Sequence, residues 1–178
     1  MKRARIKFAL AVAAVGVVGA GGVALAADGG DSETLTGYEE VPALSTPGVG
    51  EFTASVSRAG DSIRYRLTFS DLESAATQAH IHFENETNIG PIVVFLCTNL
   101  GNGPAGTQAC PAGGGTIRGT IRAADVGAGA AAQGIAAGEF DEFVRAIRAG
   151  ATYVNVHSVN RAGGEIRAQL GDDEDHDH

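Results

Sequence analysis

The chain has 178 residues, of which 13 are basic and 21 acidic, so its formal net charge is −8. Four of the basic residues lie within the first seven positions; the remaining chain carries nine arginines against 21 acids, a net charge of −12. Such an acidic surface repels phosphate backbones, which excludes nucleic acid as a partner. About 150 residues behind the N-terminal segment suit one domain with a hydrophobic core.

The N-terminal segment has the pattern of a secretory signal peptide, expected at residues 1–27. A basic start is followed by residues 8–27, which carry no charge and end in a run of small residues. An uncleaved anchor is the alternative, because twenty uncharged residues can span a bilayer. The alanine- and glycine-rich composition favours cleavage, so the protein is predicted to be secreted, without a membrane partner after cleavage.

The polar residues 28–34 are expected as a linker, and apolar–polar alternation follows it. Such alternation occurs at 52–56, 63–69, 116–121 and 165–170 and predicts half-buried strands of an antiparallel sheet. Residues 58–61 form a hairpin candidate between the first two strands. The run 92–96 has no polar member and predicts a central strand covered on both faces.

Two features complete the predicted domain. Phe140, Phe143, Val144 and Ile147 follow a helical spacing, which predicts one short helix closed by a glycine. Cys97 and Cys110 predict a structural disulfide in a secreted chain. The fold class is therefore all-β: a Greek-key or immunoglobulin-like antiparallel β-sandwich with one short helix at 35–170, followed by a disordered acidic tail at 171–178.

Candidate metal ligands lie in two of the predicted strands. His80 and His82 point to the same face of a strand, where two imidazoles can converge on zinc or copper. His157 shares a face with Tyr153 and Asn155 in a second strand. Glu165 is a candidate fourth ligand, or a residue that orients an imidazole. The alternatives are a solvated strand face for the histidines and a paired surface carboxylate for Glu165.

The remaining polar groups point to no catalytic set. Arg64, Arg66, Arg118 and Arg167 are expected at outward strand positions, in cross-strand ion pairs or as an anion-binding stripe. No nucleophile elbow and no phosphate-binding loop occurs, and none of the carboxylates stands out as a catalytic pair. The sequence therefore favours a protein that is not an enzyme.

Three stretches together resemble the CHRD domain family, named after chordin. They are LTGYEEVPALSTPGVGEF at 35–52, AHIHFENETNIGPIVVFL at 79–96 and GATYVNVHSVNRAGGEIRAQL at 150–170. The matching positions include Glu40, the three histidines and Glu165. The resemblance implies an extracellular location and a fold more than a function.

Three hypotheses for function follow. The first is a non-enzymatic extracellular binding module for an extracellular protein or a small ligand. The second is a copper- or zinc-binding protein, enzymatic or not, that uses His80, His82 and His157. In the third, these polar side chains are structural and hydrogen-bond loop carbonyls. A metal requires the three ring nitrogens to lie within about 4 Å of a common point.

Overall fold

The computed structural model describes residues 31–171, so the expected signal peptide at 1–27 and the tail beyond 171 lie outside the described residues. Within them the fold is all-β, with eight strands, one α-helix and three short 3-10 helices. The elements are β1 (Asp31–Thr36), η1 (Gly37–Glu39), β2 (Val49–Val56), β3 (Ile63–Ser70), β4 (Ala76–Phe83), β5 (Ile92–Thr98), β6 (Gly115–Ile121), η2 (Ala123–Asp125), η3 (Ala131–Gln133), α1 (Phe140–Arg148), β7 (Thr152–Ser158) and β8 (Ile166–Leu170).

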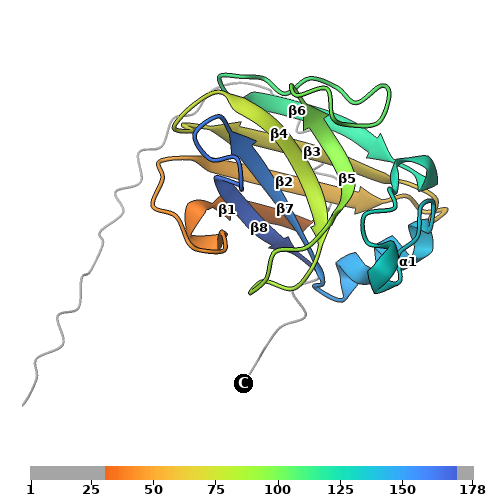
Figure 1. The fold of residues 1–178 in the computed structure, drawn as a ribbon. Coiled ribbons are helices and arrows are strands. Elements are labelled where there is room, and N and C mark those ends of the chain that lie inside the picture. Colours follow the sequence, from red (N-terminus) through yellow and green to blue (C-terminus); the bar gives the residue numbers. More distant parts are fainter. Residues whose placement is uncertain (1–30, 172–178) are drawn as a thin grey trace, which may run out of the picture.

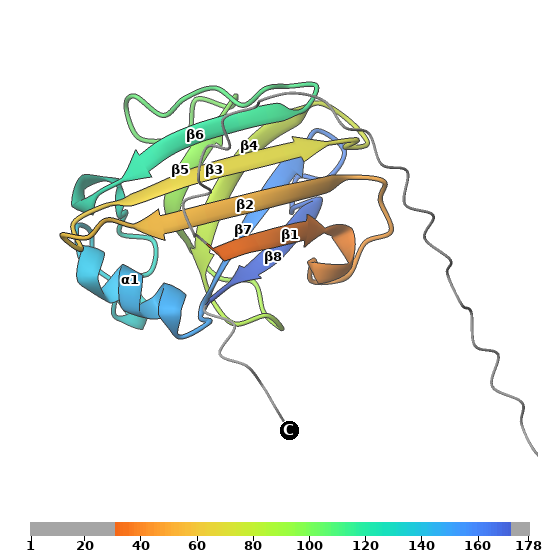
Figure 2. The ribbon, with the colours of Figure 1, turned by 180° about the vertical axis from the view of Figure 1, so that it is seen from behind.

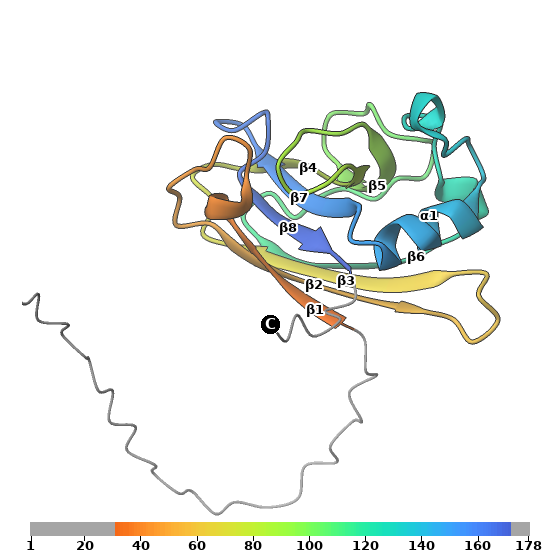
Figure 3. The same ribbon diagram turned by 90° about the horizontal axis from the view of Figure 1, so that it is seen from below.

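The eight strands form one sheet in the order β5-β4-β7-β8-β1-β2-β3-β6, and every pair is antiparallel. The sheet folds over into two facing layers, β5-β4-β7-β8 and β1-β2-β3-β6 (Figures 1 and 3). Figure 2 shows the second layer from its outer side. The chain crosses between the layers after β3, β5 and β6, so the predicted β-sandwich is confirmed.

The core lies between the layers. In β3 the buried side chains are Ile63, Tyr65, Leu67 and Phe69, and they alternate with exposed or half-buried polar residues as the period of two requires. The helix α1 closes one end of the sandwich (Figures 1 and 3) and buries Phe140, Phe143 and Val144. No helix among residues 31–171 is long and apolar enough to cross a bilayer.

Two expectations about strands differ from the structure. The apolar run 92–96 lies in β5, which is an edge strand and not a central one. Other segments cover its outer edge: Gly127 N–H donates to Val93 O at 2.8 Å, and Thr98 N–H donates to Gln108 O at 2.9 Å. In addition, β1 begins at Asp31, within the expected linker, and pairs along its length with β2.

The predicted disulfide between Cys97 and Cys110 is confirmed, with a Cα–Cα distance of 5.1 Å. It fastens the loop after β5 to the end of that strand. The Asn99 side chain adds hydrogen bonds to the carbonyls of Ala76 and Cys110, at 2.9 and 3.0 Å. The long glycine-rich loop is therefore held against the sheet at two points.

Candidate metal centre

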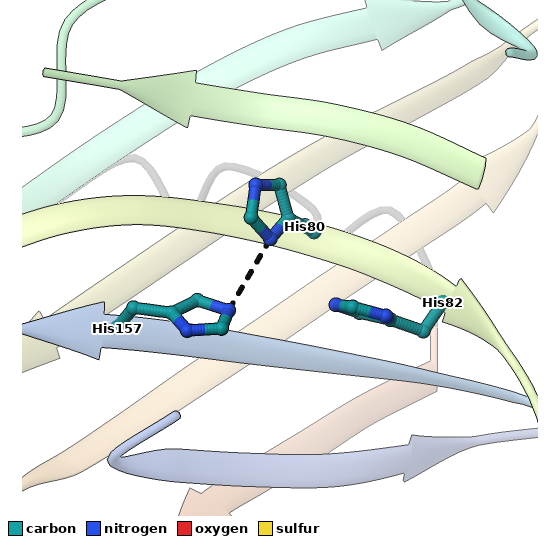
Figure 4. A group of neighbouring side chains, drawn as sticks. All are labelled: His80, His82 and His157. Carbon is teal, nitrogen blue, oxygen red and sulfur yellow. Dashed lines mark hydrogen bonds between the residues drawn. The ribbon is translucent and has the colours of Figure 1, made fainter. Parts of the chain in front are cut away.

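The candidate site lies on the outer face of β4 and β7. Ala79, Ile81, Val154 and Val156 point into the core, as the strand phase predicts, and His80, His82 and His157 share the opposite face. Figure 4 shows the three histidines on the side of these strands turned away from the second layer. This face is not solvated, since His80 is fully buried and the other two are at most 7 % exposed.

Three loops cover this face. They are residues 40–48 between η1 and β2, 84–91 between β4 and β5, and 159–165 between β7 and β8. Loop 84–91 contacts the site through Gly90, and loop 159–165 through Ala162, whose carbonyls bind histidine rings. Loop 40–48 brings Glu40 close to Gly164. The polar side chains on this outer sheet face are therefore buried beneath loops.

One ring nitrogen of each histidine lies within 4.8 Å of the corresponding nitrogens of the other two. A point therefore exists within about 2.8 Å of all three, which is 4.8 Å divided by √3. Bonds from zinc to imidazole nitrogen are about 2.0–2.1 Å long, so small ring rotations would bring all three into bonding distance. The geometric condition for a shared metal is met.

Hydrogen bonds to carbonyls fix the tautomers of two histidines. Nδ1 of His82 lies 2.9 Å from the Gly90 carbonyl oxygen, and Nδ1 of His157 lies 2.9 Å from that of Ala162. Because a carbonyl only accepts, Nδ1 carries the proton in both rings and Nε2 presents a lone pair. In Figure 4 a ring nitrogen of His82 points toward the space between His80 and His157.

His80 supplies the third nitrogen. Its Nδ1 lies 3.2 Å from Nε2 of His157, and its ring meets Phe95 edge to face, with centroids 4.5 Å apart. Nε2 of His80 has no hydrogen-bond partner among the described residues. The tautomer that carries the proton on Nε2 leaves Nδ1 as a lone pair. All three convergent nitrogens are then acceptors.

Burial keeps the three imidazoles neutral. It lowers the pKa of His80 to about 3 and that of His82 to about 4, with positive charge on the neighbouring rings as a further cause. Burial also lowers the pKa of His157. The neutral ring is the form that binds a metal, so the cluster is in its binding form well below pH 7.

Asn155 and Glu40 extend the cluster beyond the histidines. Oδ1 of Asn155 lies 3.0 Å from Nε2 of His157. On its other side the Asn155 side chain donates to the Glu40 carboxyl. Burial raises the pKa of Glu40 to about 7, partly opposed by the positive charge of Arg167. Sequence reasoning missed a role for Glu40, which stood out only as a matching position of the first family stretch.

Glu165 has a different environment from either expectation. It is fully buried, which excludes a surface ion pair. Its carboxylate accepts from the Thr46 hydroxyl at 2.7 Å, from the Glu73 amide at 2.7 Å and from the Ser158 hydroxyl. It is not a member of the convergent group, which consists of His80, His82 and His157. These contacts join segments of the chain to one another and leave the expected role as a ligand without support.

Arg167 lies at an outward position of β8 as expected, but it is neither exposed nor in a cross-strand ion pair with another residue of the sheet. It is 1 % exposed, and its guanidinium lies 3.5 Å from the centroid of the Tyr153 ring. It donates to the carbonyls of Asn85 and Asn88, at 3.0 Å each, because loop 84–91 covers the outer face of β8. Arg64, Arg66 and Arg118 are exposed as expected, and Arg66 lies 3.8 Å from Glu51.

A family model of the CHRD domain matches residues 32–170. The chain belongs to the CHRD domain family. The resemblance seen in the sequence is thereby confirmed over nearly all described residues. Neither the curated proteins nor the solved structures yielded a match.

In this CHRD domain the three stretches that carry the resemblance meet at the candidate site. The stretch 35–52 supplies Glu40, 79–96 supplies His80, His82 and the covering loop, and 150–170 supplies Asn155 and His157. These segments are distant in the sequence and adjacent in the fold, since β4 pairs with β7 and β7 with β8. The family motifs therefore converge on this buried group of polar side chains.

Proposed function

We propose that this CHRD domain is an extracytoplasmic metal-binding protein that holds a zinc or copper ion with His80, His82 and His157. The observation that carries the proposal is the convergence of three neutral imidazoles from two adjacent strands, with one nitrogen of each within 4.8 Å of the others. Lone pairs that point at one another repel, and a cation bound between them turns that repulsion into three bonds. Imidazole donors suit zinc and copper.

The hydrogen bonds that hold the histidine rings are of the kind found in known metal sites. A ligating histidine ordinarily donates its other ring N–H to a carbonyl or carboxylate, which fixes the ring and strengthens the donor. His82 and His157 both make this hydrogen bond, to Gly90 and Ala162. The third hypothesis, in which the histidines only hold loops, accounts for these bonds but not for the buried, unpartnered Nε2 of His82.

The location is inferred from two further features. The Cys97–Cys110 disulfide supports folding in an oxidising compartment, and the family is an extracellular one. The predicted signal peptide at 1–27 would deliver the chain there. Binding of an extracellular protein or a small ligand stays a prediction from the sequence.

The test is metal titration of the full chain carrying H176Q and H178Q, so that the tail histidines do not contribute. We expect one zinc or copper ion per chain by elemental analysis after dialysis. H82Q and H157Q should each lower the affinity at least about tenfold, because each removes one donor. Circular dichroism of each variant checks that it is folded. A folded parent chain without stoichiometric metal would overturn the proposal.

A further inference from the structure

We infer that Asn155 is the fourth donor of this centre and that Glu40 positions it, which closes the coordination sphere of the metal. The inference rests on the proposed metal function and specifies the kind of metal site. Neither Asn155 nor Glu40 belongs to the group of three histidines.

The distances around His157 fit a tetrahedral donor set. Nε2 of His157 lies 3.2 Å from Nδ1 of His80 and 3.0 Å from Oδ1 of Asn155. Four donors bound at about 2.0–2.2 Å to a tetrahedral ion lie about 3.3–3.6 Å from one another. The Asn155 oxygen therefore lies close to the distance from His157 that a fourth donor would have.

Glu40 determines which end of the Asn155 amide faces the histidines. A carboxamide carries an acceptor oxygen at one end and a donor nitrogen at the other. The Glu40 carboxyl receives a hydrogen bond from Asn155, and only Nδ2 can donate it. Oδ1 is consequently turned toward His157. Glu40 is 8 % exposed, so its contact with Asn155 lies inside the protein.

Gly164 provides the space for this pair. A Cβ at position 164 would lie 2.5 and 2.7 Å from the two Glu40 oxygens and 2.8 Å from Nδ2 of Asn155. Real Cβ atoms essentially never show such distances, so a side chain at this position would displace the ends of Glu40 and Asn155. The φ of +127° also favours glycine here.

A closed site has a chemical consequence. Catalytic zinc sites keep one position open for water or substrate, whereas sites that fill all four positions with protein donors hold the ion without reacting. Rings also stack against the donors: Tyr153 lies parallel to His82 with centroids 4.6 Å apart, and Phe95 meets His80. A set of three nitrogens and one oxygen suits divalent zinc or copper better than soft, monovalent copper. The centre thus stores or carries a divalent ion.

Cobalt(II) tests this inference, because its visible absorption reports coordination and because azide binds only at an open position. In the full chain carrying H176Q and H178Q, azide should leave the cobalt spectrum unchanged. N155A should weaken cobalt binding about 10- to 100-fold and make the spectrum sensitive to azide. An azide-sensitive spectrum in the parent chain, or unchanged affinity in folded N155A, would overturn the inference. A parent chain that binds no cobalt and no zinc would instead overturn the proposed function.

The role of Glu40 is tested by a graded pair of variants. E40A frees the amide to rotate and should weaken cobalt binding about tenfold. E40Q should bind within about threefold of the parent, since the glutamine oxygen accepts the same hydrogen bond. In an N155D background both ends of the side chain are oxygens, so E40A should no longer weaken binding. Equal losses in E40A and E40Q, or a full loss from E40A in the N155D background, would overturn the positioning role.

Discussion

His82 and His157 each use one ring nitrogen to bond a backbone carbonyl and turn the other toward the cluster, where Nε2 of His157 lies 3.2 Å from Nδ1 of His80. The two carbonyls thereby fix the tautomers of His82 and His157 and the direction of their lone pairs. Burying polar groups in this way costs free energy, which is lowest where each group has a partner. The convergent ends are the ones that a cation would complete.

Glu40 gives a pH-dependent prediction at this scale. Its pKa rises from 4.5 to about 7 on folding, so the folded state retains a proton that the unfolded state releases between these values. Its stabilisation is therefore full below pH 4.5 and is lost as pH rises through 7. E40Q removes this dependence. Relative to the parent, its free energy of unfolding should gain on the order of 2 kcal/mol between pH 4.5 and pH 8.

Urea unfolding in the presence of a chelator measures this difference. E86Q is the control, because Glu86 is exposed in loop 84–91 and its carboxyl stays in water. If the unfolding free energies of E40Q and the parent ran parallel from pH 4.5 to pH 8, the buried carboxyl would not be retaining its proton.

The sequence predicted which residues share the site but not what encloses them. A period of two places His80 with His82 and His157 with Asn155, and the apolar partners Ala79, Ile81, Val154 and Val156 select the face. Pairing of β4 with β7 is a contact between distant segments, which periodicity does not report. The burial of Glu40 and Arg167 was not predicted for the same reason: each is buried by a segment from another part of the chain. Neither has a local signature of burial.

At the scale of elements, the three covering loops distinguish this layer from an ordinary sandwich face. Polar side chains hold these loops in place: Arg167 of β8 binds loop 84–91, and Glu165 in loop 159–165 binds Thr46 in loop 40–48. The side chain of Gln169 adds bonds to the carbonyls of Glu84 and Gly150, at 3.0 and 2.7 Å. The polar residues of β8 thus act as anchors, although alternation alone suggested a solvated face.

Adjacent glycines in loop 159–165 give a matched prediction. Gly164 has a φ of +127° and no room for a Cβ, whereas nothing lies within 4 Å of a Cβ at Gly163. G164A should lower the free energy of unfolding by about 2 kcal/mol or more, through backbone strain and displacement of Glu40. G163A should change it by less than about 0.5 kcal/mol. Thermal or urea unfolding compares the two, and equal effects would show that the loop accommodates a side chain at both positions.

The strands themselves were predictable because alternation and turn residues mark them locally. The disulfide and the helix followed in the same way, from cysteine count and from 3.6-residue spacing. The position of β5 at the edge was not predictable, because covering segments make an edge strand as apolar as a central one. Val93 and Leu96 are buried beside loops, not beside another strand on that side.

At the scale of the whole molecule, the sheet is one continuous ribbon of strands folded on itself. Its layers join where β8 meets β1, through the registered pair Thr36 and Arg167. Its ends, β5 and β6, lie on the other side of the sandwich (Figure 1). The candidate site occupies one outer face of this structure, so its occupancy and the stability of the fold are linked.

The metal-free fold should weaken in acid because of the histidines. Their pKa values in the folded state lie below the unfolded value of 6.5, so the unfolded state binds more protons below pH 6.5 and stability falls with pH. Between pH 6.5 and pH 4.5 His80 and His82 should each contribute about 2 kcal/mol to this loss, and His157 contributes in the same direction. The double variant H82Q/H157Q should therefore lose less stability than the parent over this range. Urea unfolding midpoints at four pH values measure this difference in stability loss. The contribution of Glu40 is the same in both chains and cancels in the comparison.

The separation of the donors along the chain has a kinetic consequence. His80 and His157 are 77 residues apart, so the full donor set exists only after β4 and β7 have paired. Closing that long loop precedes any gain from the ion, which leaves the folding rate unaffected. An ion bound at the proposed site would act instead on the reverse step and slow unfolding. Exchange of the ion with a chelator should then proceed no faster than the opening of the loops and strands that hold it.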